Sequence, residues 1–202
     1  MGNLTTLAFV RHGQTDWNAA GRIQGIIDIP LNADGRAQAG ALAGRFEGEH
    51  WDLIVTSSLS RAHETGRIIA EVLHAPLATD SRIREMNFGR LEGTDEAGRI
   101  KRWGEQWNDL EHGIEKKEEV LKRGYQFLQE LTENHEGKKV MVISHGAFIG
   151  TLIRDMMKAA EYEASLFNTS VSILNYREQQ WECLLFNCNA HLKVPSPMNG
   201  RV

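Results

Sequence analysis

Three short polar motifs in this sequence carry residues that can hold an anion, and each lies at or shortly after the end of an apolar block. The motifs are Arg11-His12-Gly13, Ser60-Arg61 and Ser144-His145-Gly146, after apolar blocks at 7–10, 53–55 and 140–143. Two guanidinium groups can balance the charge of a phosphoryl group, which is about −2, and their planar forks match its oxygens. A neutral imidazole can attack phosphorus when its other nitrogen donates to a fixed acceptor. These residue types therefore indicate phosphoryl-group chemistry.

A proton donor is also needed, because the oxygen that leaves in phosphoryl transfer must be protonated and a carboxyl group is the usual donor. Glu85 is the best candidate among the 27 acidic residues, since it lies in a glycine-bounded, loop-like segment. The alternative is an exposed loop carboxylate with no catalytic part. The remaining histidines do not show the spacing of a metal-ligand set, so we expect no metal ion.

Alternating strand and helix patterns predict how these motifs are brought together. Short apolar blocks indicate strands at 4–10, 52–56 and 139–144, and apolar residues at helical spacing indicate helices at about 33–46, 118–134 and 148–157. Such alternation predicts an α/β fold, a three-layer αβα sandwich with a mostly parallel mixed sheet covered on both faces. The carboxyl ends of parallel strands share one edge, so two arginines and two histidines can meet in one pocket there.

Local signals refine the boundaries of these elements. Asn32 is predicted to cap the helix that follows it, and the serines at 57, 58 and 60 are predicted to cap a helix with Arg61 in its first turn. Gly137 is expected at the C′ position of the helix at 118–134. The remaining predicted elements are a long loop with one helical turn at 14–32, an edge strand at 76–79, and a hairpin of strands at 171–176 and 181–186.

The composition is that of an ordinary globular protein, with 202 residues, 41% hydrophobic residues and a net charge of −4. We expect one domain over 1–202, with a small cap excursion at 93–117 and a loose tail at about 193–202. The mild acidity argues against a nucleic-acid or membrane partner, and no apolar run approaches the ~20 residues of a membrane span. Because the start resembles no signal peptide and Cys183 and Cys188 are too few for a disulfide framework, we expect a soluble cytoplasmic protein with reduced thiols.

Five motifs in the same order make this chain resemble the histidine phosphatase superfamily, in the phosphoglycerate-mutase-like branch that includes broad-specificity phosphatases. The resemblance covers about residues 4–175 and implies a phosphoglycerate-mutase-like fold. The motifs are Arg11-His12-Gly13-Gln14-Thr15 with Asn18 and Gly21-Arg22-Ile23-Gln24-Gly25, then Asp28-Ile29-Pro30-Leu31 with Gly35 and Gln38-Ala39, then Ser57-Ser58-Leu59-Ser60-Arg61-Ala62 with Thr65, then Glu85 with Phe88-Gly89 and Glu92-Gly93, and last Ser144-His145-Gly146.

The resemblance implies a role for each candidate residue. His12 would be the nucleophile that forms a transient phosphohistidine, and Glu85 would protonate the leaving alcohol and then help water to attack the phosphoenzyme. The phosphoryl oxygens would be held by Arg11, Arg61 and His145, and the substrate-binding residues would be Asn18 and Gln24. No cofactor and no metal are implied, since the arginines supply the charge that magnesium provides elsewhere. The expected partner is a small-molecule phosphate ester, bound by a monomer or a homodimer.

Departures from the family pattern bear on the substrate. The excursion at 93–117 is short and lacks the paired arginines with which the mutases hold a sugar-acid carboxylate and a second phosphate. The sequence Gly113-Ile114-Glu115-Lys116 stands where many of the phosphatases carry Gly-Glu-Ser. These differences favour a phosphatase over the alternative, a cofactor-dependent phosphoglycerate mutase. The candidates for an apolar wall around the leaving group, with core packing as the alternative, are Trp17, Trp103 and Trp107.

The alternative to an enzyme is that the chain is an inactive member of the family that only binds a phosphorylated ligand. The complete set of candidate residues counts against it, because a pure binding protein has no need of an acid such as Glu85.

Overall fold

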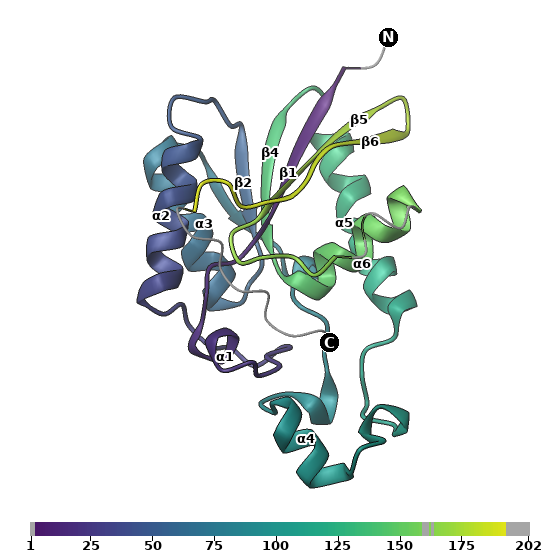
Figure 1. Cartoon of the computed structure of the whole chain (residues 1–202). Helices are drawn as coiled ribbons and strands as arrows, with labels where there is room; N and C mark the ends of the chain where they lie inside the picture. The colour runs from purple at the N-terminus through teal and green to yellow at the C-terminus, as the bar shows by residue number, and fades with distance from the viewer. Residues whose placement is uncertain (1–2, 159–161, 163, 193–202) are drawn as a thin grey trace.

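The computed structural model describes residues 3–158, 162 and 164–192 (Figure 1), and the tail predicted at 193–202 lies outside them. Its strands are β1 (Thr5–Arg11), β2 (Leu53–Thr56), β3 (Leu77–Thr79), β4 (Lys139–Ser144), β5 (Val171–Arg177) and β6 (Gln180–Cys188). Its helices are α1 (Asp16–Ala19), α2 (Ala33–Arg45), α3 (Ser60–Leu73), α4 (Glu96–Trp103), α5 (Lys117–Asn134) and α6 (Gly146–Met157).

All the strands of the described residues belong to one mixed sheet with the order β3-β2-β4-β1-β5-β6. Strands β3, β2, β4 and β1 run parallel, whereas β5 is antiparallel to β1 and β6 is antiparallel to β5. The mostly parallel sheet is thus confirmed, and the predicted C-terminal hairpin forms its antiparallel side. The predicted edge strand is present as β3.

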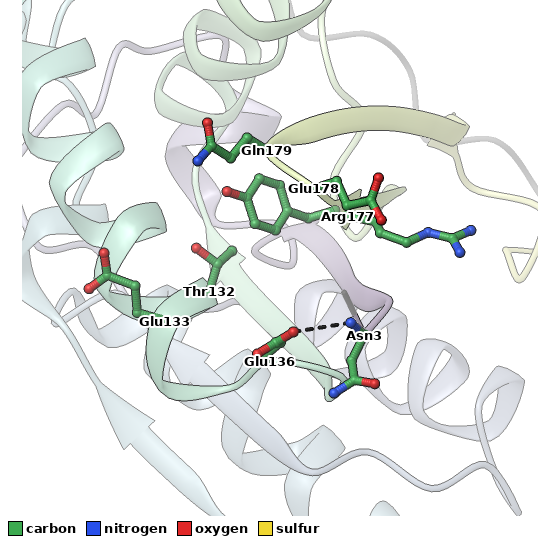
Figure 2. Close-up of a pocket in the computed structure, with 8 residues that line it drawn as sticks. Asn3, Thr132, Glu133, Glu136, Arg177, Glu178 and Gln179 are labelled. Atoms are coloured by element: carbon green, nitrogen blue, oxygen red, sulfur yellow. Dashed lines mark hydrogen bonds between the residues drawn. The ribbon is translucent and has the colours of Figure 1, made fainter. Parts of the chain in front are cut away.

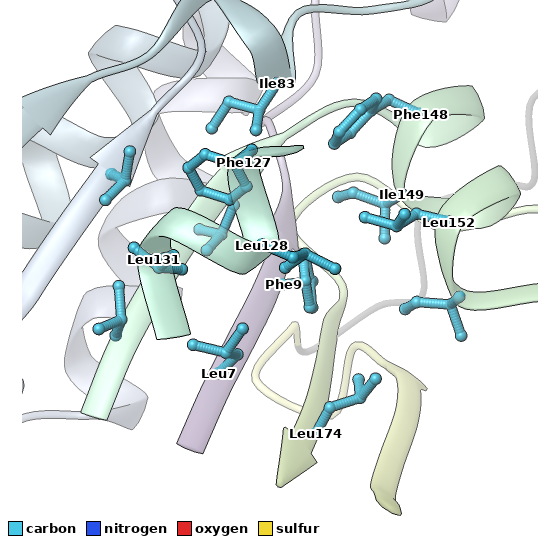
Figure 3. Packing of buried hydrophobic residues seen from close by; sticks show 14 of the residues in the cluster. Leu7, Phe9, Ile83, Phe127, Leu128, Leu131, Phe148, Ile149, Leu152 and Leu174 are labelled. Atoms are coloured by element: carbon cyan, nitrogen blue, oxygen red, sulfur yellow. The ribbon is translucent and has the colours of Figure 1, made fainter. Parts of the chain in front are cut away.

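Helices cover both faces of this sheet, which gives the three layers predicted from the sequence (Figure 1). Side chains alternate along β1, so that Leu7 and Phe9 pack with α5 and α6, whereas Ala8 and Val10 pack with α2 and α3. Figure 3 shows the first of these two clusters, where side chains from β1, α5 and α6 meet. Burying each large apolar side chain contributes about 1.5–3 kcal/mol, so the two clusters hold the strands and helices in fixed relative positions.

The beginnings of the helices agree with the predicted caps in one case and correct them in another. Asn32 caps α2, and its Oδ1 accepts from the Gly35 amide at 2.8 Å. The serine caps predicted for α3 are wrong, because the N-cap is Leu59, which makes no side-chain capping bond. Instead, the Ser60 amide and hydroxyl both donate to Asp28 Oδ1 at 2.8 Å. A carboxylate from the loop at 14–32 therefore binds the first amide of α3.

The position predicted for Gly137 is wrong by one residue. Helix α5 ends at Asn134 with His135 as its C-cap, and Gly137 follows two residues later with a φ of +76°. Its amide donates to Thr5 Oγ1 at 2.9 Å. The glycine thus makes the left-handed turn into β4 and does not stand directly at the end of the helix.

Two long connections lie beside each other at the carboxyl edge of the sheet. The segment at 14–32 is a loop with one short helix, α1, as predicted. It pairs with the excursion at 93–117, because the Ile23 amide donates to the Thr94 carbonyl at 3.0 Å and the Gly93 amide donates to the Ile23 carbonyl at 2.7 Å. The excursion contains α4, which Figure 1 shows projecting below the sheet. None of the described helices is long and apolar enough to cross a membrane.

Candidate active site

The register of the parallel strands puts the ends of the polar motifs next to one another. Arg11, at the end of β1, is paired with Ser144, at the end of β4, and the His12 amide donates to the Ser144 carbonyl at 2.9 Å. On the other side of β4, the Ser57 amide donates to the Ile143 carbonyl at 2.9 Å. The first residues beyond β1, β4 and β2 are therefore neighbours along the carboxyl edge of the sheet.

His12 is buried in a defined tautomer. It is 2% exposed, and its ring centroid lies 5.1 Å from that of His145. Its Nδ1 lies 2.7 Å from the Gly13 carbonyl oxygen. Because a carbonyl oxygen can only accept, Nδ1 carries the proton, and Nε2 of the neutral ring keeps its lone pair. Gly13 itself is closely confined, since a Cβ there would lie 2.4 Å from the Gly35 carbonyl oxygen.

His145, directly before α6, is fully buried. Its Nε2 lies 2.8 Å from Ser57 Oγ, while its Nδ1 has no hydrogen-bond partner among the described residues. A buried nitrogen without a partner destabilises the folded state. A phosphoryl group bound beside this ring would offer such a partner.

The two arginines are held by main-chain carbonyl groups. Arg61, in the first turn of α3, is fully buried, and its Nη1 and Nη2 donate to the carbonyl oxygens of Ile27 and Gly25 at 2.8 and 2.7 Å. Arg11 Nη1 donates to the Leu166 carbonyl at 2.5 Å. The Nε atoms of both arginines are buried and have no partner among the described residues. The guanidinium groups are therefore fixed in place with N–H groups still available for an anion.

Burial and positive neighbours keep both histidines neutral. Burial is the main reason why the pKa values of His12 and His145 lie well below the ordinary 6.5, and the charges of Arg61 and Arg11 lower them further. Burial also lowers the pKa of Arg11 to about 10, although Glu85 opposes this change, so Arg11 stays cationic at neutral pH. The edge of the sheet therefore combines neutral imidazoles with charged guanidinium groups.

Glu85 is 8% exposed and lies against the first turn of α6, so it is not the exposed loop carboxylate that its sequence context left open. Its Oε1 accepts from the Phe148 amide at 2.9 Å and from the Met86 amide at 3.0 Å, and its Oε2 accepts from the Ala147 amide at 3.2 Å. Backbone N–H groups at a helix N-terminus are a natural site for an anionic group. Glu85 also stabilises the charges of Arg11 and Arg61.

Asn18 lies beside the backbone of His12. Its Oδ1 accepts from the Thr15 amide at 3.2 Å, within the capping box of α1. The same oxygen accepts from Asn168 Nδ2 at 3.3 Å, and that amide also lies 3.0 Å from the His12 carbonyl oxygen, to which it donates. Asn168, on the segment before β5, therefore fixes both residues. Asn168 stands in no motif of the sequence, so its place in the site could not be predicted from the sequence.

Gln24 and the tryptophans are related less directly to this site. Gln24 is buried and its Oε1 has no partner among the described residues; its link to the site is its neighbour Gly25, whose carbonyl binds Arg61. The Trp17 ring faces Gly93, where a Cβ would lie 3.2 Å from it. Two further tryptophans, Trp103 and Trp107, pack on the small cluster of Ile23, Phe88 and Leu91. They thus have a packing role, and an apolar wall for the leaving group stays a prediction.

No metal site is found among the described residues, which contain no group of three His, Cys, Asp or Glu side chains that could hold a metal ion. A pocket at the opposite, amino edge of the sheet contains an Asn3 amide that donates to Glu136 Oε1 at 3.0 Å (Figure 2). Its lining residues, none of which is a candidate, are Asn3, Thr132, Glu133, Glu136, Tyr176, Arg177, Glu178 and Gln179.

Known proteins that are similar to this chain include phosphatases and a probable phosphoglycerate mutase. The family model described as histidine phosphatase superfamily (branch 1) matches residues 7–189. The uncharacterized phosphatase PhoE of Bacillus subtilis (strain 168) is 35% identical over 191 residues, which cover 94% of this chain and 97% of that protein. The probable phosphoglycerate mutase GpmB of Yersinia enterocolitica is 36% identical over 184 residues, 85% of each chain. A solved structure of mycobacterial glucosyl-3-phosphoglycerate phosphatase in complex with VO3 has a TM-score of 0.81 at 27% identity, over 90% of this chain and 98% of that one.

Proposed function

This chain belongs to branch 1 of the histidine phosphatase superfamily, and from that membership we propose that it hydrolyses small-molecule phosphate monoesters, without a metal ion, through a phosphohistidine on His12. The observation that carries the proposal is the state of His12. Its ring is neutral, Nδ1 donates to the Gly13 carbonyl, and Nε2 keeps a lone pair close to the charges of Arg11 and Arg61. A neutral nucleophile beside fixed cations is what attack on a phosphate dianion requires.

In the first step, His12 Nε2 forms a bond to phosphorus while the bond between phosphorus and the ester oxygen breaks. Glu85 gives that oxygen the proton that its carboxylate takes from water in the second step of the preceding turnover, so a neutral alcohol leaves. The charge on the transferring oxygens is balanced by Arg11 and Arg61, and the neutral ring of His145 can donate a hydrogen bond to one of these oxygens through its unpartnered Nδ1. Loss of one such donor typically lowers the rate by ~10²–10³.

In the second step, water attacks the phosphohistidine. The Glu85 carboxylate takes a proton from this water, the bond between phosphorus and Nε2 breaks, and inorganic phosphate is released with neutral His12 restored. Asn18 is oriented for phosphate binding by its Oδ1, which accepts from Thr15 and Asn168, so its Nδ2 is the part that can donate to a phosphate oxygen.

The test is turnover of p-nitrophenyl phosphate by the purified protein. We expect activity that a chelator leaves unchanged and that vanadate inhibits. His12→Ala should lower kcat/KM by about a thousand-fold or more. The matched control is His63→Ala, because His63 is exposed on α3 and should keep full activity. A His12→Ala protein that retained most of the activity, or a wild-type protein that a chelator inactivated, would contradict the proposal.

A second candidate function is phosphoglycerate mutase activity, which the similarity to GpmB favours. It requires transfer of phosphate between the two monophosphoglycerates with a bisphosphate primer. We expect hydrolysis to exceed this transfer, and a measured excess of transfer over hydrolysis would replace the phosphatase proposal by the mutase.

A further inference from the structure

Arg123 is a buried cation for which the mechanism above has no role. It stands in α5 and is 8% exposed. Its Nη1 donates to the carbonyl oxygens of Arg82 and Arg84 at 2.6 and 2.7 Å, and its Nη2 donates to the Glu85 carbonyl at 3.3 Å. One guanidinium group therefore binds three carbonyl groups of the segment that leads into Glu85.

Glu115 holds this guanidinium group from the other side. Its Oε1 accepts from Arg123 Nε at 2.9 Å and its Oε2 accepts from Arg123 Nη2 at 3.2 Å, in a largely buried bidentate ion pair. Glu115 also pairs with Asn87 in both directions, since its Oε2 accepts from the Asn87 amide at 3.1 Å and its own amide donates to the Asn87 carbonyl at 2.7 Å. The ion pair thus ties the chain on both sides of Glu85 to the start of α5.

The same guanidinium group also packs against α6, the helix whose first amides bind the Glu85 carboxylate. Arg123 Cζ lies 4.8 Å from the centre of the Phe148 ring, and the Phe148 amide donates to Glu85 Oε1 at 2.9 Å. The next residue, Gly124, allows α5 to approach α6 closely, because a Cβ there would lie 3.0 Å from Leu152 Cδ1. Arg123 therefore fixes the main chain of Glu85 directly and its carboxylate through α6.

We propose that Arg123 and Glu115 are positioning residues that place the Glu85 carboxyl group for proton transfer to the leaving oxygen. The inference rests on the proposed function, in which Glu85 is the acid. A misplacement of about 1 Å can lower a rate by about a hundred-fold. Its effect depends on the leaving group: a nitrophenolate leaves readily without a proton, whereas an alkoxide does not.

A purely structural ion pair would behave differently. Its loss would lower stability and reduce the rates for all substrates by the same factor. The loss of a positioning device instead changes the ratio of the kcat/KM values for an aryl and an alkyl phosphate. Because both values are measured on the same sample, this ratio does not depend on the fraction of protein that is folded.

The experiment compares p-nitrophenyl phosphate with glycerol phosphate in the wild-type protein, Arg123→Lys and Glu115→Gln. We expect the aryl-to-alkyl ratio to rise by about ten-fold or more in Arg123→Lys, since lysine is a point donor and cannot bridge the three carbonyl groups and the carboxylate. A smaller rise is expected in Glu115→Gln. The matched control is Arg67→Lys, which changes an exposed pair with Glu71 on α3 and should leave the ratio unchanged.

The outcomes separate this inference from the proposed function. An active wild-type protein with an unchanged ratio in both variants would overturn the positioning role and leave the phosphatase function standing. A wild-type protein that hydrolyses neither ester would overturn the proposed function itself. If Arg123→Lys does not fold, Glu115→Gln decides alone, with a raised ratio in support and an unchanged ratio against.

Discussion

Mild acid should destabilise this protein before most of its carboxylates titrate, because His12 and His145 are buried in the neutral form. Burial and the charges of Arg61 and Arg11 hold both pKa values well below 6.5 in the folded protein. In the unfolded chain the same imidazoles take up protons near their ordinary pKa. Below that pH the unfolded state binds more protons than the native state, so the free energy of unfolding falls as pH falls.

The magnitude follows from the number of buried imidazoles. Each imidazole that stays neutral in the native state over this range lowers the free energy of unfolding by about 2 kcal/mol between about pH 7 and pH 5. His12 and His145 together should therefore lower it by about 4 kcal/mol, a large part of the stability of a typical domain. His191, whose pKa burial lowers to about 4, changes stability in the same direction.

Urea unfolding at several pH values across this range measures the effect, with linear extrapolation to water at each pH. His12→Gln and His145→Gln each remove one imidazole, so the free energy of unfolding of each variant should fall by about 2 kcal/mol less than that of the wild type over the range. Because only the change with pH is compared, a general destabilisation by the substitution cancels. His63→Gln, at an exposed position, should follow the wild type. The same pH dependence in all four proteins would refute the argument that these two histidines are buried neutral.

Three further predictions concern the groups around the two histidines. Gly25→Ala should lower the free energy of unfolding by at least about 1–2 kcal/mol, because Gly25 has a φ of +53° and a Cβ there would lie 1.9 Å from Glu92 Oε1. Urea unfolding measures this loss. A fall in kcat/KM would show that the Gly25 carbonyl no longer holds Arg61 in place. Ser57→Ala removes the partner of His145 Nε2 and should lower the free energy of unfolding by about 1–3 kcal/mol, which the urea midpoint reports. Inorganic phosphate at about 100 times its Kd should stabilise the wild type by about 2.7 kcal/mol and should stabilise Arg61→Met much less, and equal shifts of the melting temperature in the two proteins would argue against a phosphate site at Arg61.

The strand ends that carry the candidate residues could be predicted because their signals are local. An apolar block that stops at a polar motif marks both the strand and its end, and parallel pairing then brings these ends together. Arg11, His12, Arg61 and His145 meet for this reason. The Asn32 cap was predictable in the same way, since its partner is only three residues away.

What sequence reasoning missed depends on contacts between residues far apart in the chain. The serines around the start of α3 have the right chemistry for a cap, yet Ser57 Oγ contacts His145 and Ser60 Oγ donates to Asp28. A local pattern cannot show that a side chain has a better partner elsewhere. The same holds for Arg123, whose carbonyl partners lie 38–41 residues earlier in the sequence.

The most direct test of the central claim is to trap the phosphoenzyme. Wild-type protein mixed with a radiolabelled phosphate ester and quenched within one turnover should carry an acid-labile, base-stable phosphoryl group, and peptide mapping by mass spectrometry should place it on His12. His12→Ala should carry none. A label on another residue, or turnover of the ester by His12→Ala at the wild-type rate, would contradict the account.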